Sequence, residues 1–242
     1  GKKTTQLRVN KQESKNAKIT DAEFSALQLS AIKLSKAQKN LRRRLIESVK
    51  KIPNISFIPI PSVGCYIPGG QARYPSSAIM SVITAAEAGV KRIVVVSPPS
   101  SDGKIDPMTI TVAQNCGAEI YKAGGAQAIA ALAYGTKSIP KVDKIVGPGG
   151  KFVSIAKAIV SEETSIDMIA GPTELGIIVD SSVDPELVAY DLVSQAEHSN
   201  DTMCFVITKS KSKAKQIQKS LEKLIPNVER SSIVKQSISK NG

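Results

Sequence analysis

Residues 123–150 read AGGAQAIAALAYGTKSIPKVDKIVGPGG, and this stretch decides the fold. Gly124 and Gly125 can adopt backbone angles that other residues resist. They are followed by residues 126–133, which are apolar except at Gln127, so we expect a buried helix. The first turn of a helix has unpaired N–H groups, and the glycine pair would let an anionic ligand approach them beside Gln127.

The second half of the stretch predicts a strand at residues 142–146. The turn at residues 147–150 then leads into a second helix, residues 152–160. Open α/β sheets tend to hold ligands at such strand-to-helix turns. The glycines could equally serve only chain reversal and close packing, because Phe152 stands where the dinucleotide fingerprint has its last glycine.

The same alternation of strands and helices extends over most of the chain, which predicts parallel sheets covered on both faces. Residues 21–48 have apolar residues at helical spacing and predict one long amphipathic helix, or two. The other predicted helices are residues 76–88, 107–116, 185–197 and 211–224, and the other predicted strands are residues 93–96, 118–121, 166–170, 175–179 and 203–208.

Other segments read as irregular. Prolines keep residues 52–63 extended, and residues 64–77, GCYIPGGQARYPSS, predict a turn-rich loop. We expect Ser76 to cap the helix that follows this loop, and we expect a polar tail after residue 224. Gly1 is not a natural start, so we expect the sequence to be cut from a longer chain.

Charge and composition argue against several classes of protein. The net charge of +12 divides into +10 over residues 1–56, −5 over residues 57–208 and +7 over residues 209–242. The organised middle is therefore mildly acidic, and with 4% aromatic residues we expect no nucleic-acid partner. No apolar run or signal peptide indicates a membrane protein or a secreted one, so we expect a cytoplasmic protein. The three cysteines have no CxxC spacing and indicate neither a disulfide framework nor a cysteine zinc site.

His198, the single histidine, ends the motif SQAEH, with Gln195 three residues earlier. On a helix these two side chains share a face and could converge on one metal ion or ligand. A single histidine at a helix end is more often a C-terminal charge partner. Tyr66 could contact a ligand or cover the prolines of its own loop, and Thr173 could bind substrate or its own backbone. A Ser-His-Asp triad and a P-loop are both missing from the sequence.

Five motifs occur together in order: GCYIPGG, AGGAQAIAALAYGT, KVDKIVGPGG, IDMIAGPTE and DLVSQAEH. In this respect the chain resembles histidinol dehydrogenase over roughly residues 63–208. That family makes L-histidine from L-histidinol in two NAD-dependent oxidations and works as a homodimer. The resemblance implies two incomplete Rossmann-like α/β domains with parallel sheets and amino-terminal helices. It also implies an inserted domain at residues 66–172 within a discontinuous one made of residues 1–65 and 173–242.

By the same resemblance, Gln195 and His198 match zinc ligands that also touch substrate. Tyr66 and Gln127 match residues that contact the dinucleotide. Thr173 stands where the family usually has a substrate-binding serine, and Gly150 stands where it has an asparagine that contacts NAD.

The family's remaining functional residues follow the region that matches Thr208. They are the glutamate-histidine acid/base pair and the aspartate and histidine that complete the zinc shell. None occurs before Gly242, so we expect this chain to be inactive alone. The alternative is a non-catalytic ligand-binding fragment, or a degenerate relative that keeps the fold.

Overall fold

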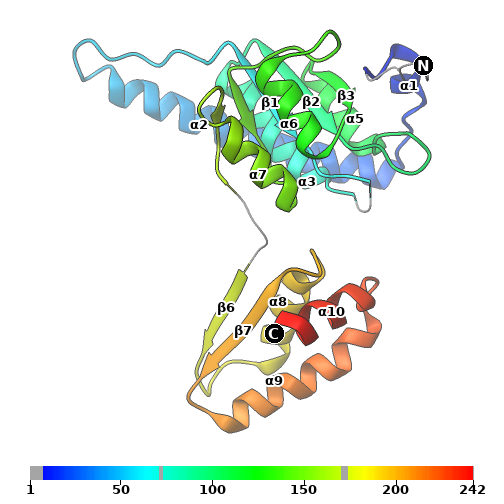
Figure 1. The fold of residues 1–242 in the computed structure, drawn as a ribbon. Coiled ribbons are helices and arrows are strands. Elements are labelled where there is room, and N and C mark those ends of the chain that lie inside the picture. Colours follow the sequence, from blue (N-terminus) through cyan, green and yellow to red (C-terminus); the bar gives the residue numbers. More distant parts are fainter. Residues whose placement is uncertain (1–7, 71–72, 170–173, 242) are drawn as a thin grey trace. The chain divides into compact units, whose positions relative to one another are not determined.

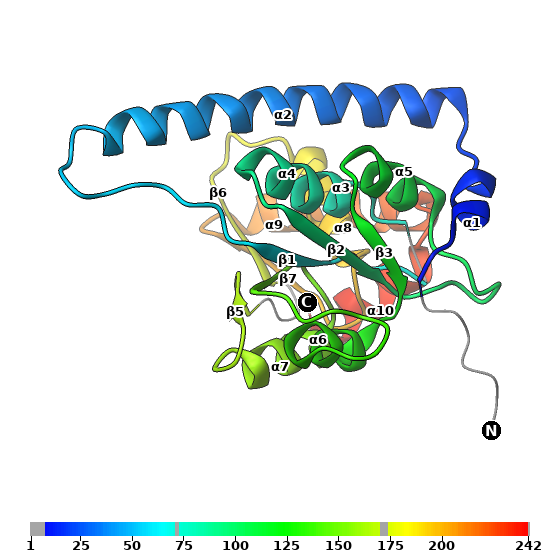
Figure 2. The same cartoon turned by 90° about the horizontal axis from the view of Figure 1, so that it is seen from above.

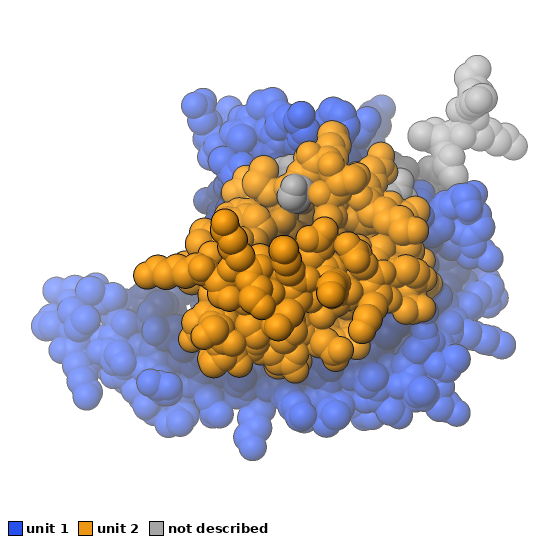
Figure 3. All heavy atoms as spheres, turned by 90° about the horizontal axis from the view of Figure 1, so that it is seen from below, with its two compact units in different colours: residues 1–170 blue, residues 171–242 orange. Residues whose placement is uncertain are grey.

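The computed structural model describes residues 8–70, 73–169 and 174–241. Its contacts divide the chain into two compact units, Gly1–Ala170 and Gly171–Gly242, which are coloured in Figure 3. None of the helices in the described parts of the chain combines the length and the apolar character needed to cross a bilayer.

Unit 1 is built on a parallel five-stranded sheet of order β3-β2-β1-β4-β5. Its helices lie on both faces of this sheet, as the alternation predicted, with α2, α3, α4 and α5 on one face and α6 and α7 on the other (Figure 2). The strands are β1 Ser62–Tyr66, β2 Arg92–Ser97, β3 Glu119–Lys122, β4 Lys144–Val146 and β5 Ser165–Ile166. The helices are α1 Lys11–Asn16, α2 Asp21–Val49, α3 Pro75–Ala78, the π-helical η1 Ile79–Ile83, α4 Thr84–Ala88, α5 Pro107–Asn115, α6 Gly125–Tyr134 and α7 Lys151–Val160.

The long amino-terminal helix is a single one. Thr20 caps α2, and the side chain of Glu23 returns a hydrogen bond to the Thr20 backbone, which completes a capping box. Leu27 is the residue of α2 that is fully buried, and most of the rest of the helix is exposed. The two apolar cores of unit 1 lie on opposite faces of the sheet. One is under α2 to α5, and the other is under α6 and α7.

The predicted loop at residues 64–77 is wrong at its start, because Gly64, Cys65 and Tyr66 belong to the central strand β1. A Cβ atom on Gly64 would lie 2.8 Å from a methyl group of Leu132, so glycine is required here by the packing of α6 on the strand. Ser76 is not the helix cap either. The helix begins at Pro75, and its N-cap residue Tyr74 makes no side-chain capping bond.

Unit 2 contains the two parallel strands β6 Glu174–Val179 and β7 Met203–Thr208 (Figure 1). Its helices are α8 Pro185–Ala196, α9 Lys211–Leu224, the 3₁₀ turn η2 Ile225–Asn227 and α10 Ser231–Asn241. The expected polar tail is thus wrong over α10, where buried Val234 joins the core and buried Ser237 donates a hydrogen bond to the Thr202 carbonyl oxygen.

The expected domain boundary between residues 65 and 66 falls inside β1. In this chain, β1 and the amino-terminal helices belong to the same compact unit as the rest of the five-stranded sheet. The assignment of residues 1–65 to one domain with residues 173–242 stays a prediction.

Candidate functional site

The carboxyl ends of β1 and β4 mark the point where the order of the sheet reverses. The chain runs from β1 outward through β2 to β3, then returns to place β4 on the other side of β1. Such a switch point opens a crevice at the carboxyl ends of the two strands, where α/β sheets bind ligands. Here the strands end at Tyr66 and Val146. Two of the residues predicted to contact a cofactor, Tyr66 and Gly150, are therefore at or just after this edge.

Tyr66 is 5% exposed, and its ring packs in the core between the sheet and α6. Its hydroxyl oxygen accepts a hydrogen bond from the backbone N–H of Gly125 at 3.1 Å. Burial raises the pKa of the Tyr66 phenol above its ordinary value, so the group stays neutral at physiological pH. Tyr66 thereby joins the end of β1 to the first turn of α6.

The first turn of α6 is the glycine pair singled out in the sequence. Gly124 is the N-cap, and a Cβ atom there would lie 2.5 Å from Cβ of Pro98. Gly125 has a φ of 64°, in the left-handed region that favours glycine. Close packing and chain reversal thus both explain these glycines. Gln127, two residues after Gly125, is exposed, so its amide is accessible at the start of α6.

The turn 147–150 contains two glycines that the fold requires and one that it does not. Gly147 has a φ of 112°, and a Cβ atom there would lie 2.1 Å from the carbonyl oxygen of Tyr66. A Cβ atom on Gly149 would lie 2.3 Å from a methyl group of Val153. Gly150 is the N-cap of α7 in an extended conformation, with open space where a side chain would be. The fold therefore accepts an asparagine at Gly150.

An ion pair between a buried lysine and a partly exposed aspartate contacts this turn and was not predicted from the sequence. Lys157 is 1% exposed, forms an ion pair with Asp167, and donates a hydrogen bond to the Gly147 carbonyl oxygen at 3.0 Å. Asp167 in turn accepts a hydrogen bond from the Gly147 N–H at 2.8 Å. The signal in the sequence was the helical spacing of Val153, Lys157 and Val160, which places a lysine on the apolar face of its helix.

In unit 2, α8 ends at Ala196, one residue earlier than the predicted helix end at residue 197. Gln195 is in its last turn, and His198 follows the C-cap residue Glu197, outside the helix on which the two were expected to share a face. Gln195 is half-buried and His198 is exposed. Nδ1 of His198 lies 2.8 Å from the carbonyl oxygen of Ser194. A carbonyl can only accept, so Nδ1 is the donor, and in the neutral form of the ring Nε2 is then the nitrogen with a lone pair for a ligand.

A complete metal site is not formed by these residues alone. Within the described residues there is no group of three or more His, Cys, Asp or Glu side chains placed to hold a metal ion. The predicted substrate residue Thr173 lies outside the described residues.

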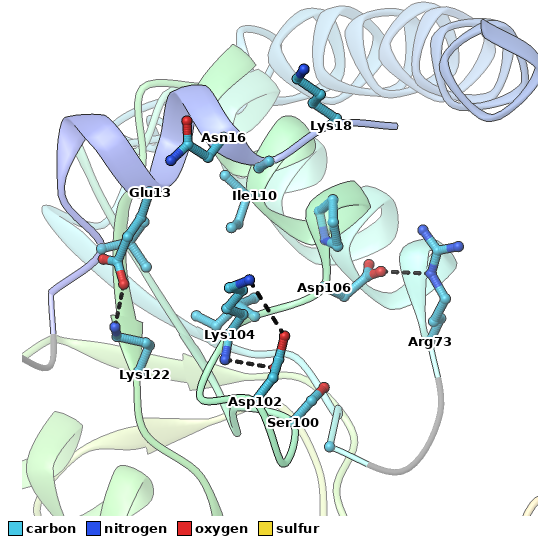
Figure 4. A pocket seen from close by; sticks show the side chains of 15 residues that line it. Glu13, Asn16, Lys18, Arg73, Ser100, Asp102, Lys104, Asp106, Ile110 and Lys122 are labelled. Carbon is cyan, nitrogen blue, oxygen red and sulfur yellow. Dashed lines mark hydrogen bonds and ion pairs between the residues drawn. The ribbon is translucent and has the colours of Figure 1, made fainter. Parts of the chain in front are cut away.

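A cavity of about 600 Å³ lies elsewhere in unit 1, between α1, α5 and the end of β3 (Figure 4). Several of its charged side chains form ion pairs with one another. Lys122 bonds Glu13 at 2.5 Å, and Arg73 bonds Asp106 at 2.6 Å. The first pair connects α1 to β3, and the second connects the loop before α3 to the start of α5. The cavity includes none of the predicted site residues.

Comparison with known proteins agrees with the resemblance in the motifs. A sequence model described as histidinol dehydrogenase matches residues 1–242. The chain is 51% identical over 185 residues to a histidinol dehydrogenase of Oceanobacillus iheyensis, covering 76% of this chain and 43% of that protein. It is 43% identical over 248 residues to one of Bacillus cereus, covering 100% of this chain and 58% of that protein.

Among solved structures, the crystal structure of histidinol dehydrogenase from Elizabethkingia anophelis matches with a TM-score of 0.83 and 35% identity. The match covers 97% of this chain and 56% of that chain. The chain thus spans about half the length of the relatives it matches. The whole-chain family match, the shared fold and the α/β architecture lead to one conclusion: this chain belongs to the histidinol dehydrogenase family.

Proposed function

We propose that this chain is part of a zinc- and NAD-dependent histidinol dehydrogenase, which oxidises L-histidinol to L-histidine in histidine biosynthesis. The family match over residues 1–242 carries the proposal. The chain spans about half of its relatives' length, so we assign catalysis to a longer protein and expect the 242-residue chain to be inactive alone. We place the complete enzyme in the cytoplasm, as a homodimer.

Gln195 and His198 are the proposed zinc ligands of this chain. The contact between His198 Nδ1 and the Ser194 carbonyl supports this role, because metal-binding histidines commonly donate their other ring N–H to such an acceptor. A catalytic zinc needs at least three protein ligands, so two donors hold it weakly until the rest of the shell is supplied.

The proposed NAD site is the crevice at the switch point between β1 and β4. Tyr66, Gln127 and Gly150 are the contacts carried over from the family. The open space at Gly150 and the exposed amide of Gln127 support this placement. The N-terminus of α6 adds backbone N–H groups, which favour an anionic group such as a pyrophosphate.

In the complete enzyme, Gln195, His198 and Thr173 bind and orient the substrate. Zinc held by Gln195 and His198 would supply Lewis-acid chemistry, and NAD held at the switch point would supply the hydride acceptor. The contribution of this chain is thus to bind and orient the substrate and the cofactor. Proton transfer belongs to residues outside this sequence.

Calorimetric titration of zinc and then L-histidinol into the chain tests the proposal. We expect weak zinc binding that is required for histidinol binding, and we expect His198→Ala to weaken zinc binding by at least about tenfold. Asp191→Ala is the matched control, because Asp191 is exposed on the same helix and is not a proposed ligand. Equal zinc affinity of His198→Ala and the parent chain would remove His198 from the metal site.

The competing function is a non-catalytic ligand-binding fragment. It is favoured by the finding that the described residues hold no complete metal cluster. Formation of NADH from L-histidinol by the isolated chain with added zinc would overturn both this alternative and our expectation that the chain is inactive alone.

A further inference from the structure

Lys157 occupies a position where burying its charged side chain costs free energy of folding. It lies on the apolar face of α7 beside Val153 and Val160, and 1% of its surface is exposed. A buried ammonium group loses its hydration and is retained only when it is paired and hydrogen-bonded. Asp167, whose side chain is 28% exposed, supplies the opposite charge. The pair therefore needs an explanation beyond general stability, because an apolar side chain would fill this position at less cost.

The two charged groups act on one residue. Lys157 donates to the carbonyl oxygen of Gly147 at 3.0 Å, and Asp167 accepts from the N–H of the same glycine at 2.8 Å. Gly147 follows the last residue of β4. Both backbone groups of Gly147 are thus held by side chains from elements that follow in the sequence.

Gly147 has little freedom on its other side as well. An added Cβ atom would lie 2.1 Å from the carbonyl oxygen of Tyr66, so its backbone is in close contact with the end of β1. The hydroxyl of Tyr66 in turn accepts the N–H of Gly125. A chain of contacts consequently runs from Lys157 and Asp167 through Gly147 and Tyr66 to the first turn of α6.

We propose that Lys157 and Asp167 are positioning residues for the dinucleotide. They fix the Gly147 backbone so that the turn 147–150 and the first turn of α6 present their N–H groups to the anionic part of the cofactor in one geometry. This inference rests on the proposed NAD site. Lys157 does not itself bind the cofactor, because its ammonium group is directed to Gly147 and Asp167.

The test compares NAD affinity and thermal stability in three variants of the 242-residue chain. Lys157→Met keeps the length of the side chain and removes the donor, and Asp167→Asn keeps an acceptor and removes the charge. Lys122→Met is the matched control. Lys122 has a 13% exposed side chain that is paired with Glu13, but it is the last residue of β3 and does not contact the turn after β4. Binding is measured by NAD titration well below each melting temperature, and the amide resonances of residues 147–150 are followed by NMR.

We expect Lys157→Met and Asp167→Asn to weaken NAD binding by about tenfold or more and to shift the amide resonances of the turn. Lys122→Met should lower the melting temperature by a similar amount and leave NAD affinity within about twofold. Folded Lys157→Met with the parent affinity would overturn the inference, and so would an equal loss of affinity in Lys122→Met. A parent chain that fails to bind NAD would instead refute the proposed cofactor site, and this inference with it.

Discussion

The hydroxyl oxygen of Tyr66 lies 3.1 Å from the backbone nitrogen of Gly125 and accepts its hydrogen bond. This bond connects the end of the central strand to the start of α6, 59 residues later in the chain. The bond keeps the end of β1 and the start of α6 at a constant separation, and these are the two places where we expect the dinucleotide to contact the backbone. The ring of Tyr66 is part of the core, so we expect it to act on the proposed site through this bond.

Tyr66→Phe tests this relationship. The variant keeps the buried ring and removes the acceptor, so we expect a loss of about 1 kcal/mol in the free energy of unfolding together with weaker NAD binding. Chemical denaturation and NAD titration measure the two effects. Tyr134→Phe is the control, because Tyr134 is on α6, the helix that begins at Gly125, and is 57% exposed. A folded Tyr66→Phe chain with unchanged NAD affinity would show that the bond has no role in the site.

Gly150→Asn should strengthen NAD binding. The position has an extended backbone, and an added Cβ atom would have no neighbour within 4 Å, so we expect an asparagine to be accommodated. Asparagine is also a good N-cap, and we expect α7 to be stabilised by a few tenths of a kcal/mol. Gly149→Asn, one residue earlier, should be strongly destabilising because its Cβ would clash with Val153. Melting temperatures and NAD titration of both variants check this contrast, and equal behaviour of the two would refute it.

Gly64 and Leu132 should be energetically coupled. An alanine at Gly64 would place its methyl group 2.8 Å from a methyl group of Leu132, so we expect Gly64→Ala to destabilise the chain by about 1–3 kcal/mol. Leu132→Ala leaves a cavity and should cost about 2–5 kcal/mol. In the double variant, the added methyl group partly occupies that cavity. A double-mutant cycle should give a favourable coupling of at least about 0.5 kcal/mol, and additive losses would contradict the contact.

Stability should fall in alkaline solution because of Cys65. Burial raises the pKa of the Cys65 thiol to about 12, so the folded chain binds this proton more tightly than the unfolded chain does. The resulting stabilisation is fully present below the unfolded pKa of about 8.5 and is lost as pH rises toward 12. The slope from one group is at most about 1.4 kcal/mol per pH unit.

Urea unfolding of the parent chain and of Cys65→Ala across this pH range measures the effect. The variant should be less stable at neutral pH because it loses core volume, but its stability should fall less steeply with pH. Cys204→Ala is a useful comparison, because burial raises the pKa of that thiol as well, in the separate core of unit 2. Parallel curves for the parent and Cys65→Ala would contradict the assignment.

The alternation of helices and strands was predictable because it depends on local sequence patterns. Glycine positions and apolar periodicity located α6, α7 and β2 to within about two residues, since those signals need only neighbouring residues. Asp184 starts α8, and Gly89 ends α4 with a left-handed backbone, both as their residue types indicate. The motifs shared with the family likewise point to Tyr66, Gln127 and Gly150, because each of these residues lies within a continuous stretch of sequence.

Other features depended on distant contacts. Gly64 reads as part of a turn in the sequence, yet it lies in the central strand, paired with Val94 and Ile145. It is a glycine there because Leu132 leaves no room for a side chain. The many polar residues of α10 made it read as a tail. It is a helix whose buried side chains pack against a core formed by residues much earlier in the chain.

The sequence by itself determined the class of the protein, because glycine turns, helix starts and apolar spacing are local properties and the family motifs are continuous. Only the tertiary structure decided which backbone groups are hydrogen-bonded by side chains, and by which side chains. The ion pair of Lys157 and Asp167, the Gly147 backbone between them and the tyrosine hydroxyl at Gly125 are joined across the sheet. Residues 10 to 59 positions apart meet there because parallel strands bring their carboxyl ends to one edge, which no local pattern records.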